Sequence, residues 1–310
     1  MKLDGRAIVL LILLALTLAL PLFGGTFIVK LATRIMIFSI AVIGLDILLG
    51  YTGLVSLGHA AFFGVGAYTV GILAHYGITS AFVAFPAAIA AAALAALLIG
   101  ALSLRTTGIY FIMITLAFAQ MLYYFAQALK AFGGDDGFPM KARSDFAGIV
   151  DIAGHLNFFY TVLVFLLVVL FIAHRIVRSR FGVVIRGRKD NERRLAAIGF
   201  PPYRYKLVAF VISGAMVGLA GALIVNHNSY FSPNLFSWVL SGDLLVMCIL
   251  GSVGTLIGPI LGAAVFLGFE EALSDITVHW MFIMGPLIVA RVLFIKDGLY
   301  GLLEKALAKP

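Results

Sequence analysis

The sequence predicts an all-α polytopic membrane protein, and two observations support this fold class. Of the 310 residues, 63% are hydrophobic and 12% are charged, with a mean hydropathy of +1.11. Soluble domains carry about 45–50% apolar and about 25% charged residues, so this chain has too little polar surface to cover a water-soluble globule. Its apolar residues also gather into runs of roughly 20 residues, the length that crosses a bilayer as a helix.

Ten apolar runs divide the chain, and each is a candidate transmembrane helix. They cover approximately residues 7–23, 34–50, 58–76, 82–102, 108–128, 156–175, 207–226, 239–253, 256–272 and 279–295. The third and ninth runs are rich in glycine, which also suits a half-helix or a re-entrant segment. We therefore expect about eight to ten spans. We expect them to form a single transmembrane domain over residues 1–310, without a separate soluble domain.

The first run follows Lys2 and Arg6 and has two interpretations. A basic start before a short apolar stretch is typical of a signal peptide. No convincing small-x-small cleavage site precedes Gly24, however, because Pro21 and Phe23 stand in that region. We therefore expect a retained first transmembrane helix.

The placement of basic residues predicts the orientation of the chain. If the N-terminus is cytoplasmic, ten Lys and Arg residues between positions 175 and 206 fall inside, opposed only by Asp190 and Glu192. The loop 129–155, with four Asp against three Lys and Arg, then falls outside. Basic residues accumulate in cytoplasmic loops, so we expect both termini in the cytoplasm, with Lys30 and Arg34 as exceptions. The net charge of +8 thus reflects membrane topology, and no nucleic-acid partner is expected.

Residues 50–68 and 251–263 are dense in glycine and alanine. Such residues let helix backbones approach closely in a membrane bundle, and they also permit broken helices that line a cavity. Both interpretations stay open for Gly53, Gly58 and Gly64. His59 is interpreted as a hydrogen-bonded structural residue, because nothing nearby completes a set of metal ligands.

Polar side chains inside apolar runs complete the candidate translocation path. Thr115 needs a partner in the bundle or a wet cavity, and interhelical hydrogen bonding is the favoured interpretation. Asp46 lies deep in the second run and Asp243 near the start of the eighth, where a carboxylate is a functional hypothesis by default. The full candidate set is Asp46, Gly53, Gly58, His59, Gly64, Thr115 and Asp243.

The basic segment of about 179–206 contains a short predicted helix over Lys189–Gly199. Asp190 or Asn191 is expected to cap its start, and Gly199 to end it. Leu195 and Ile198 are three residues apart and are expected to share one face. Such a helix suits docking into a groove on a soluble partner. A basic loop that only fixes topology and contacts anionic membrane lipid fits the spacing equally well.

Several chemical motifs are missing from the sequence. It has no G-x-x-x-x-G-K-[ST] phosphate loop and hence no recognisable ATPase of its own. HExxH, CxxC and GxSxG do not occur, the histidines are scattered, and the single cysteine is Cys248. We expect no catalytic residue, no metal site and no cofactor in this chain, and we do not expect an enzyme.

Taken in order, these segments resemble the permease subunits of branched-chain amino acid ABC importers, specifically the M-type (LivM-like) subunit. The matching segments are 50–68, 108–111 with 115–119, 133–137, 204–213, 218–222 and 251–263. They cover most of residues 40–265. One segment alone would be a weak match, whereas the ordered set is specific.

The resemblance implies a set of partners and a coupling segment. Such a subunit pairs with a second homologous permease, and the pair sits on two cytoplasmic ATP-binding subunits that hydrolyse ATP. A periplasmic or lipid-anchored binding protein delivers the solute. The segment that docks into the ATPase corresponds here to Arg188, Lys189, Asp190, Asn191, Glu192, Arg193, Arg194, Leu195, Ala196, Ala197, Ile198 and Gly199.

The sequence departs from the family pattern at two places. The family usually has an alanine pair after the glutamate that corresponds to Glu192, whereas Arg193 and Arg194 follow it here. The family also tends to have amides where Asp46 and Leu54 stand. The leading hypothesis is an ATP-driven importer permease for branched-chain amino acids in a bacterial or archaeal cell membrane. The alternatives are a secondary transporter or channel, with Asp46 and Asp243 as coupling-ion residues, and a membrane enzyme.

Overall fold

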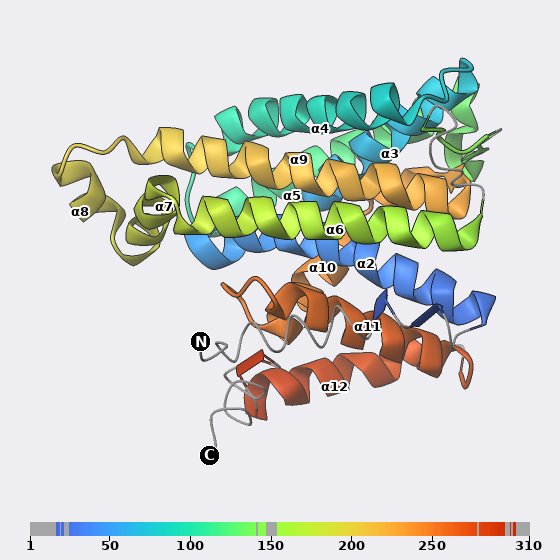
Figure 1. Ribbon diagram of the computed structural model, residues 1–310. Coiled ribbons are helices and arrows are strands. Elements are labelled where there is room, and N and C mark those ends of the chain that lie inside the picture. Colours follow the sequence, from blue (N-terminus) through green and yellow to red (C-terminus); the bar gives the residue numbers. More distant parts are fainter. Residues whose placement is uncertain are drawn as a thin grey trace, which may run out of the picture.

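The computed structural model describes residues 17–18, 20–21, 25–140, 142–146, 154–277, 279–294, 298 and 300–301. Nine of the ten predicted apolar runs coincide with helices in these ranges, which confirms the all-α membrane bundle. The first run, 7–23, lies mostly outside the described residues, so its interpretation as a retained span stays a prediction. Figure 1 shows that most of the helices lie side by side, with their axes roughly along one direction.

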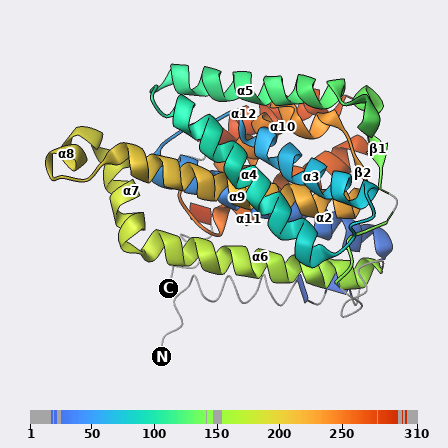
Figure 2. The ribbon, with the colours of Figure 1, turned by 90° about the horizontal axis from the view of Figure 1, so that it is seen from above.

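Within the described residues, five helices are long and apolar enough to cross a membrane. They are α2 (Thr26–Asp46) with its π-helical continuation (Ile47–Tyr51), α4 (Ala81–Ser103), α5 (Ile109–Ala128), α6 (His155–Arg178) and α9 (Pro202–Asn228). The apolar stretches of α9 and α2 are 78% and 67% buried, against 22% for α5. The first two helices therefore form the centre of the bundle, and α5 lies at its edge (Figure 2).

Four shorter helices complete the bundle. α3 (His59–His75), α10 (Trp238–Gly251), α11 (Gly258–Ser274) and α12 (Trp280–Phe294) have 14 to 17 residues. At a rise of 1.5 Å per residue they extend only about 21–26 Å, less than the roughly 30 Å of a hydrocarbon core. α3 and α11 are the third and ninth runs, whose glycines suggested half-helices. A non-helical segment precedes each of them.

Glycines bring α9 into direct backbone contact with α3. A β-carbon on Gly66 of α3 would collide with the carbonyl oxygen of Gly218. One on Gly221 of α9 would collide with the carbonyl oxygen of Phe63. On the neighbouring face of α9, Gly214 leaves room for Ala96 of α4. The interpretation that small residues permit close helix packing is confirmed for these helices.

A short sheet joins two connections at one end of the bundle, here named the β1–β2 end. β1 (Phe138–Pro139) pairs antiparallel with β2 (Tyr230–Phe231). The neighbouring 3₁₀ turns are Lys130–Phe132, Gly134–Asp136 and Pro233–Phe236, the last labelled η4. The Tyr230 hydroxyl donates to the carbonyl oxygen of Asp136. The sequence did not predict these strands, because two residues each are too few for an alternating pattern.

The opposite end carries two further helices and is named the α8 end. α7 (Arg180–Asp190) follows α6, and α8 (Glu192–Ala197) follows α7. Both views show α8 as the element that projects furthest beyond the long helices (Figures 1 and 2). The ten Lys and Arg residues of positions 175–206 therefore gather at this end.

Arg34, an exception to the charge bias, has acidic partners on another helix. Its guanidinium lies 2.9 Å from a carboxylate oxygen of Glu270 and 3.7 Å from one of Glu271, both on α11. It also lies over the ring of Phe38. Arg34 thus serves packing between α2 and α11, which explains why it escapes the topological charge rule.

Candidate functional site

The segment at the α8 end is two helices and not one. Asn191 breaks the backbone between α7 and α8, and its side-chain oxygen accepts from the amide of Arg194 at 2.9 Å. Gly199 ends the segment with φ +92°, and its amide donates to the carbonyl oxygen of Ala196. The predicted cap at Asn191 and end at Gly199 are confirmed. The predicted single helix over Lys189–Gly199 is wrong, because Lys189 and Asp190 belong to α7.

Leu195 and Ile198 do not share a face. Leu195 is 7% exposed and turns back towards Gly187 of α7, whereas Ile198 is 66% exposed. α8 ends at Ala197, so helical spacing no longer sets the direction of Ile198. The exposed apolar tip of this segment is therefore Ile198 with Phe200, and Leu195 belongs to its interior.

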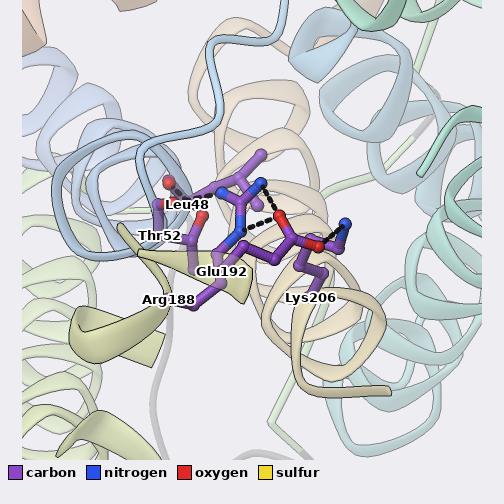
Figure 3. A network of polar contacts seen from close by, with 5 residues as sticks. All are labelled: Leu48, Thr52, Arg188, Glu192 and Lys206. Carbon is purple, nitrogen blue, oxygen red and sulfur yellow. Dashed lines mark hydrogen bonds and ion pairs between the residues drawn. The ribbon is translucent and has the colours of Figure 1, made fainter. Parts of the chain in front are cut away.

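Glu192 ties α8 to both neighbouring helices. Its Oε2 lies 2.8 Å from the guanidinium of Arg188 on α7, and its Oε1 lies 2.8 Å from Nζ of Lys206 on α9 (Figure 3). Partial burial raises the pKa of Glu192, but the bonds from Lys206 and Arg188 outweigh it and hold the pKa below its usual range. The carboxylate is therefore charged at neutral pH and accepts from two cations.

Two cations of α7, Arg188 and Lys189, reach the end of α2. Arg188 Nη1 donates to the carbonyl oxygen of Thr52 at 2.5 Å, and Lys189 Nζ donates to that of Gly50 at 2.8 Å. These carbonyls close the π-helical turn, where the last groups of a helix lack helical donors and carry partial negative charge. Figure 3 shows Arg188 between Glu192 and Thr52, so one guanidinium serves both.

The two glycine-rich segments meet at this point. Asp46 Oδ1 accepts from the amide of Gly254 at 2.7 Å and from the thiol of Cys248 at 3.4 Å. A β-carbon on Gly50 would collide with Asp46 and with the backbone of Gly254. Asp46 is 1% exposed, and the span continues past it through the π-helical turn to Tyr51, towards the α8 end.

His59 has a hydrogen bond at each ring nitrogen. Nε2 lies 2.8 Å from the hydroxyl of Ser213, which itself donates to the carbonyl oxygen of Gly44. Nδ1 lies 3.1 Å from the hydroxyl of Ser56. Because Ser213 uses its proton on Gly44, Nε2 carries the hydrogen and Nδ1 accepts from Ser56. His59 joins α3, α2 and α9, and no His, Cys, Asp or Glu cluster in the described residues could hold a metal.

The other candidate path residues pack tightly or lie elsewhere. Gly58 approaches the backbone of Thr115. The Thr115 hydroxyl donates to the carbonyl oxygen of Ile112 within α5, so the expected interhelical hydrogen bond is wrong. Gly64 lies against the ring of Phe236. Gly53, with φ +71°, contacts the Lys189 side chain. Asp243 lies near Arg34 and Glu270, so the structure does not group it with Asp46. A role of these residues in translocation stays a prediction.

Sequence reasoning missed three residues of this site. Lys206 is 5% exposed and pairs with Glu192, although it looked like the basic border of a span. Ser241 of α10 accepts from the amide of Ala60 at 2.9 Å and so satisfies the start of α3. Ser213 holds His59. A charged or hydroxyl residue at the edge of an apolar run was the available signal, but its partner is visible only in three dimensions.

Comparison with known proteins finds relatives among the permeases of branched-chain amino acid transport systems. The family profile described as "Branched-chain amino acid transport system / permease component" matches residues 27–292. The chain is 30% identical to the high-affinity branched-chain amino acid transport system permease protein LivM of Escherichia coli K12, over 94% of this chain and 74% of that protein. It is 29% identical to LivM of Salmonella typhimurium, with the same coverage.

A more distant similarity covers part of the chain. The autoinducer 2 import system permease protein LsrC of Escherichia coli O9:H4 is 26% identical over 46% of this chain and 44% of that protein. No solved structure matches the chain.

Proposed function

Because the chain belongs to the family of branched-chain amino acid transport permease components, we propose that it imports small hydrophobic amino acids under the drive of ATP hydrolysis. The chain is a multi-pass membrane permease subunit. Leucine, isoleucine and valine are the proposed solutes, since a relative of 30% identity is named for branched-chain amino acids. ATP is bound and hydrolysed by separate subunits.

The α8 end faces the cytoplasm in this proposal. It holds the ten basic residues of positions 175–206, and basic residues favour the cytoplasmic side. Gly298 lies against Ser252, and Tyr300 packs on Ile257, beside the Gly254 turn that contacts Gly50. The described part of the C-terminal region therefore lies at the same end, which supports a cytoplasmic C-terminus in a bacterial or archaeal inner membrane.

The projection of α8 is the observation that carries the coupling role. α8 extends beyond the bundle (Figure 1). It carries the exposed cations Arg193 and Arg194, and the turn that follows it presents Ile198 and Phe200 to solvent. A short helix with an apolar tip and a charged rim suits a groove on a partner, here an ATP-binding subunit with an acidic rim. Two such subunits and a second homologous permease complete the assembly. A solute-binding protein docks at the β1–β2 end.

Movement of α8 by ATP-driven closure would then shift the bundle between its inward-open and outward-open states. Such a shift requires contacts that differ between the two states. The ion pairs of Glu192 join α8 to α7 and α9. A displacement of α8 therefore pulls on both of these helices.

Purification in mild detergent from the native membrane tests this function. Recovery of a second permease and ATP-binding subunits, together with ATP-dependent leucine uptake after reconstitution, is the expected result. Recovery of the chain alone, with uptake driven by a proton gradient and indifferent to ATP, would overturn it in favour of a secondary transporter. Asp46 and Asp243 give the secondary-transporter alternative little support, because the two carboxylates do not form one site. The charged neighbour of Asp46 is Lys189, whereas those of Asp243 are Glu270 and Arg34.

A further inference from the structure

We propose that Lys189 and Arg188 transmit displacement of α8 to the glycine-rich segment 50–58, and that Asp46 passes it on to the Gly254 turn between α10 and α11. This inference rests on the proposed function, because it assumes that a partner displaces α8. It assigns positioning roles to Lys189, Arg188 and Asp46.

The first step of the relay is a rigid link between α8 and α7. Arg188 holds Glu192 by two contacts, at 3.0 Å from Nε and 2.8 Å from Nη2. The Arg188 side chain is only 11% exposed, and its third contact is the carbonyl oxygen of Thr52. A guanidinium is a planar fork, so its three bonds fix the orientation of all the groups around it. A shift of Glu192 is thereby imposed on Thr52.

The second step is a receiving segment that deforms more easily than a helix. The π-helical turn Ile47–Tyr51 ends α2, Gly53 has φ +71°, and the backbone up to Gly58 is non-helical. π-turns and irregular connections are where helices bend under load. Lys189 engages this segment at two points, by its bond to the Gly50 carbonyl and by packing of its methylene groups on Gly53.

The third step carries the displacement to the other glycine-rich segment. Gly50 and Gly254 are in backbone contact that leaves no room for a β-carbon on Gly50. The Asp46 carboxylate, one turn before Gly50, accepts from the Gly254 amide. Gly50 therefore cannot move without moving Gly254, which connects α10 to α11.

An alternative role for these cations is merely to anchor α7, and Arg186 provides the matched control. Arg186 is also on α7 and donates to the carbonyl oxygens of Gly182 at 3.1 Å and Val177 at 2.9 Å. Both acceptors lie in α6 and α7, so Arg186 anchors the segment without reaching residues 50–58. Arg186→Met should impair folding as much as Lys189→Met but should leave coupling unchanged.

The experiment measures leucine uptake and ATP hydrolysis in the same proteoliposomes, with the full complex carrying each variant. Lys189→Met and Arg188→Met should retain the ATP-binding subunits and their hydrolysis, while the solute moved per ATP falls about tenfold, the effect of a lost charge-assisted hydrogen bond. Arg186→Met should keep the wild-type ratio. An unchanged ratio in Lys189→Met would overturn the relay. Absence of ATP-binding subunits from the wild-type complex would instead reject the proposed function.

A reversible covalent link gives a second, independent measurement. A β-carbon on Gly53 would lie 3.7 Å from Cβ of Lys189, which is a good separation for a disulfide. Combining Gly53→Cys with Lys189→Cys replaces the side-chain contact by a bond, and the native Cys248 is buried and away from the oxidant. In the same preparation, coupling should be restored when the two thiols are oxidised to the disulfide, and lost when the disulfide is reduced. Equal coupling in both redox states would contradict transmission through this contact, and Gly53→Cys alone controls for strain at φ +71°.

Discussion

The Nζ of Lys189 lies 2.8 Å from the carbonyl oxygen of Gly50, although the two residues are 139 positions apart in the chain. The contact joins the basic segment 179–206 to a glycine-rich segment that packs the bundle. It places α7, α8 and the end of α2 in one hydrogen-bonded network.

Replacing Ile198 by Asp should detach the ATP-binding subunits and leave the bundle intact. Ile198 is 66% exposed, so an aspartate there meets water in the isolated chain. Substitutions at exposed sites usually change stability by less than about 0.5 kcal/mol. Co-purification of the ATP-binding subunits is the readout, with Ile198→Val as the control that should retain them. Full recovery with Ile198→Asp would show that this tip does not dock.

Gly66→Ala should destabilise the protein by about 1–3 kcal/mol, the usual range for overpacking. The added methyl group collides with the carbonyl oxygen of Gly218, which is backbone and cannot rotate away. Gly268→Ala is the matched control, because that helical glycine has no atom within 4 Å of an added β-carbon. Thermal unfolding in detergent compares the two. Equal melting temperatures of the two variants would mean that the close α3–α9 contact does not contribute to the stability of the protein.

Asp46→Asn should keep most of the uptake, whereas Asp46→Leu should lose it. Asparagine retains an oxygen that can accept from the half-buried Gly254 amide, while leucine removes that acceptor. A secondary transporter that uses Asp46 as its coupling-ion site makes the opposite forecast for asparagine, because the charge is gone. Initial rates of leucine uptake in proteoliposomes separate the two mechanisms.

The stabilisation that Glu192 provides should persist until the solution is strongly acidic. Its pKa is lowered by Lys206 and Arg188 despite the opposing effect of burial. A lowered pKa means that the stabilising contribution is fully present above the ordinary glutamate pKa of about 4.3, and is lost as the pH falls through the lowered value. The melting-temperature difference between wild type and Glu192→Gln should stay constant from about pH 5 to pH 8 and shrink below about pH 4. A difference that already shrinks near pH 6 would show that the ion pairs do not form.

The helices were predictable because each depends on a local property of the chain. Apolar runs locate the spans, Asn191 caps α8 through its own side chain, and Gly199 ends the segment through its positive φ. The preceding helix α7 was not predicted, and its last residues, Lys189 and Asp190, were assigned to the same helix as α8.

The network itself was beyond sequence reasoning, because each of its bonds joins distant positions. The carbonyl of Gly50 is a backbone group without a sequence signature, and the contact of Gly50 with Gly254 needs the packed bundle to exist. Asp46 appeared as an isolated intramembrane acid. Its neighbours Gly254 and Cys248 lie more than 200 positions later, at separations of 208 and 202.

The pairing of Arg34 with Glu270 has a consequence for biogenesis. The two residues are 236 positions apart, and at synthesis rates of about 5–20 residues per second roughly 12–47 s separate their emergence from the ribosome. During that interval Arg34, which lies towards the start of α2, has no acidic partner on α11, and a long cationic side chain near a helix end reaches towards the lipid headgroups. We therefore expect the Arg34 side chain to stay at the headgroup level until α11 has been made. A chain that stops before α11 would therefore leave Arg34 without its two glutamate partners.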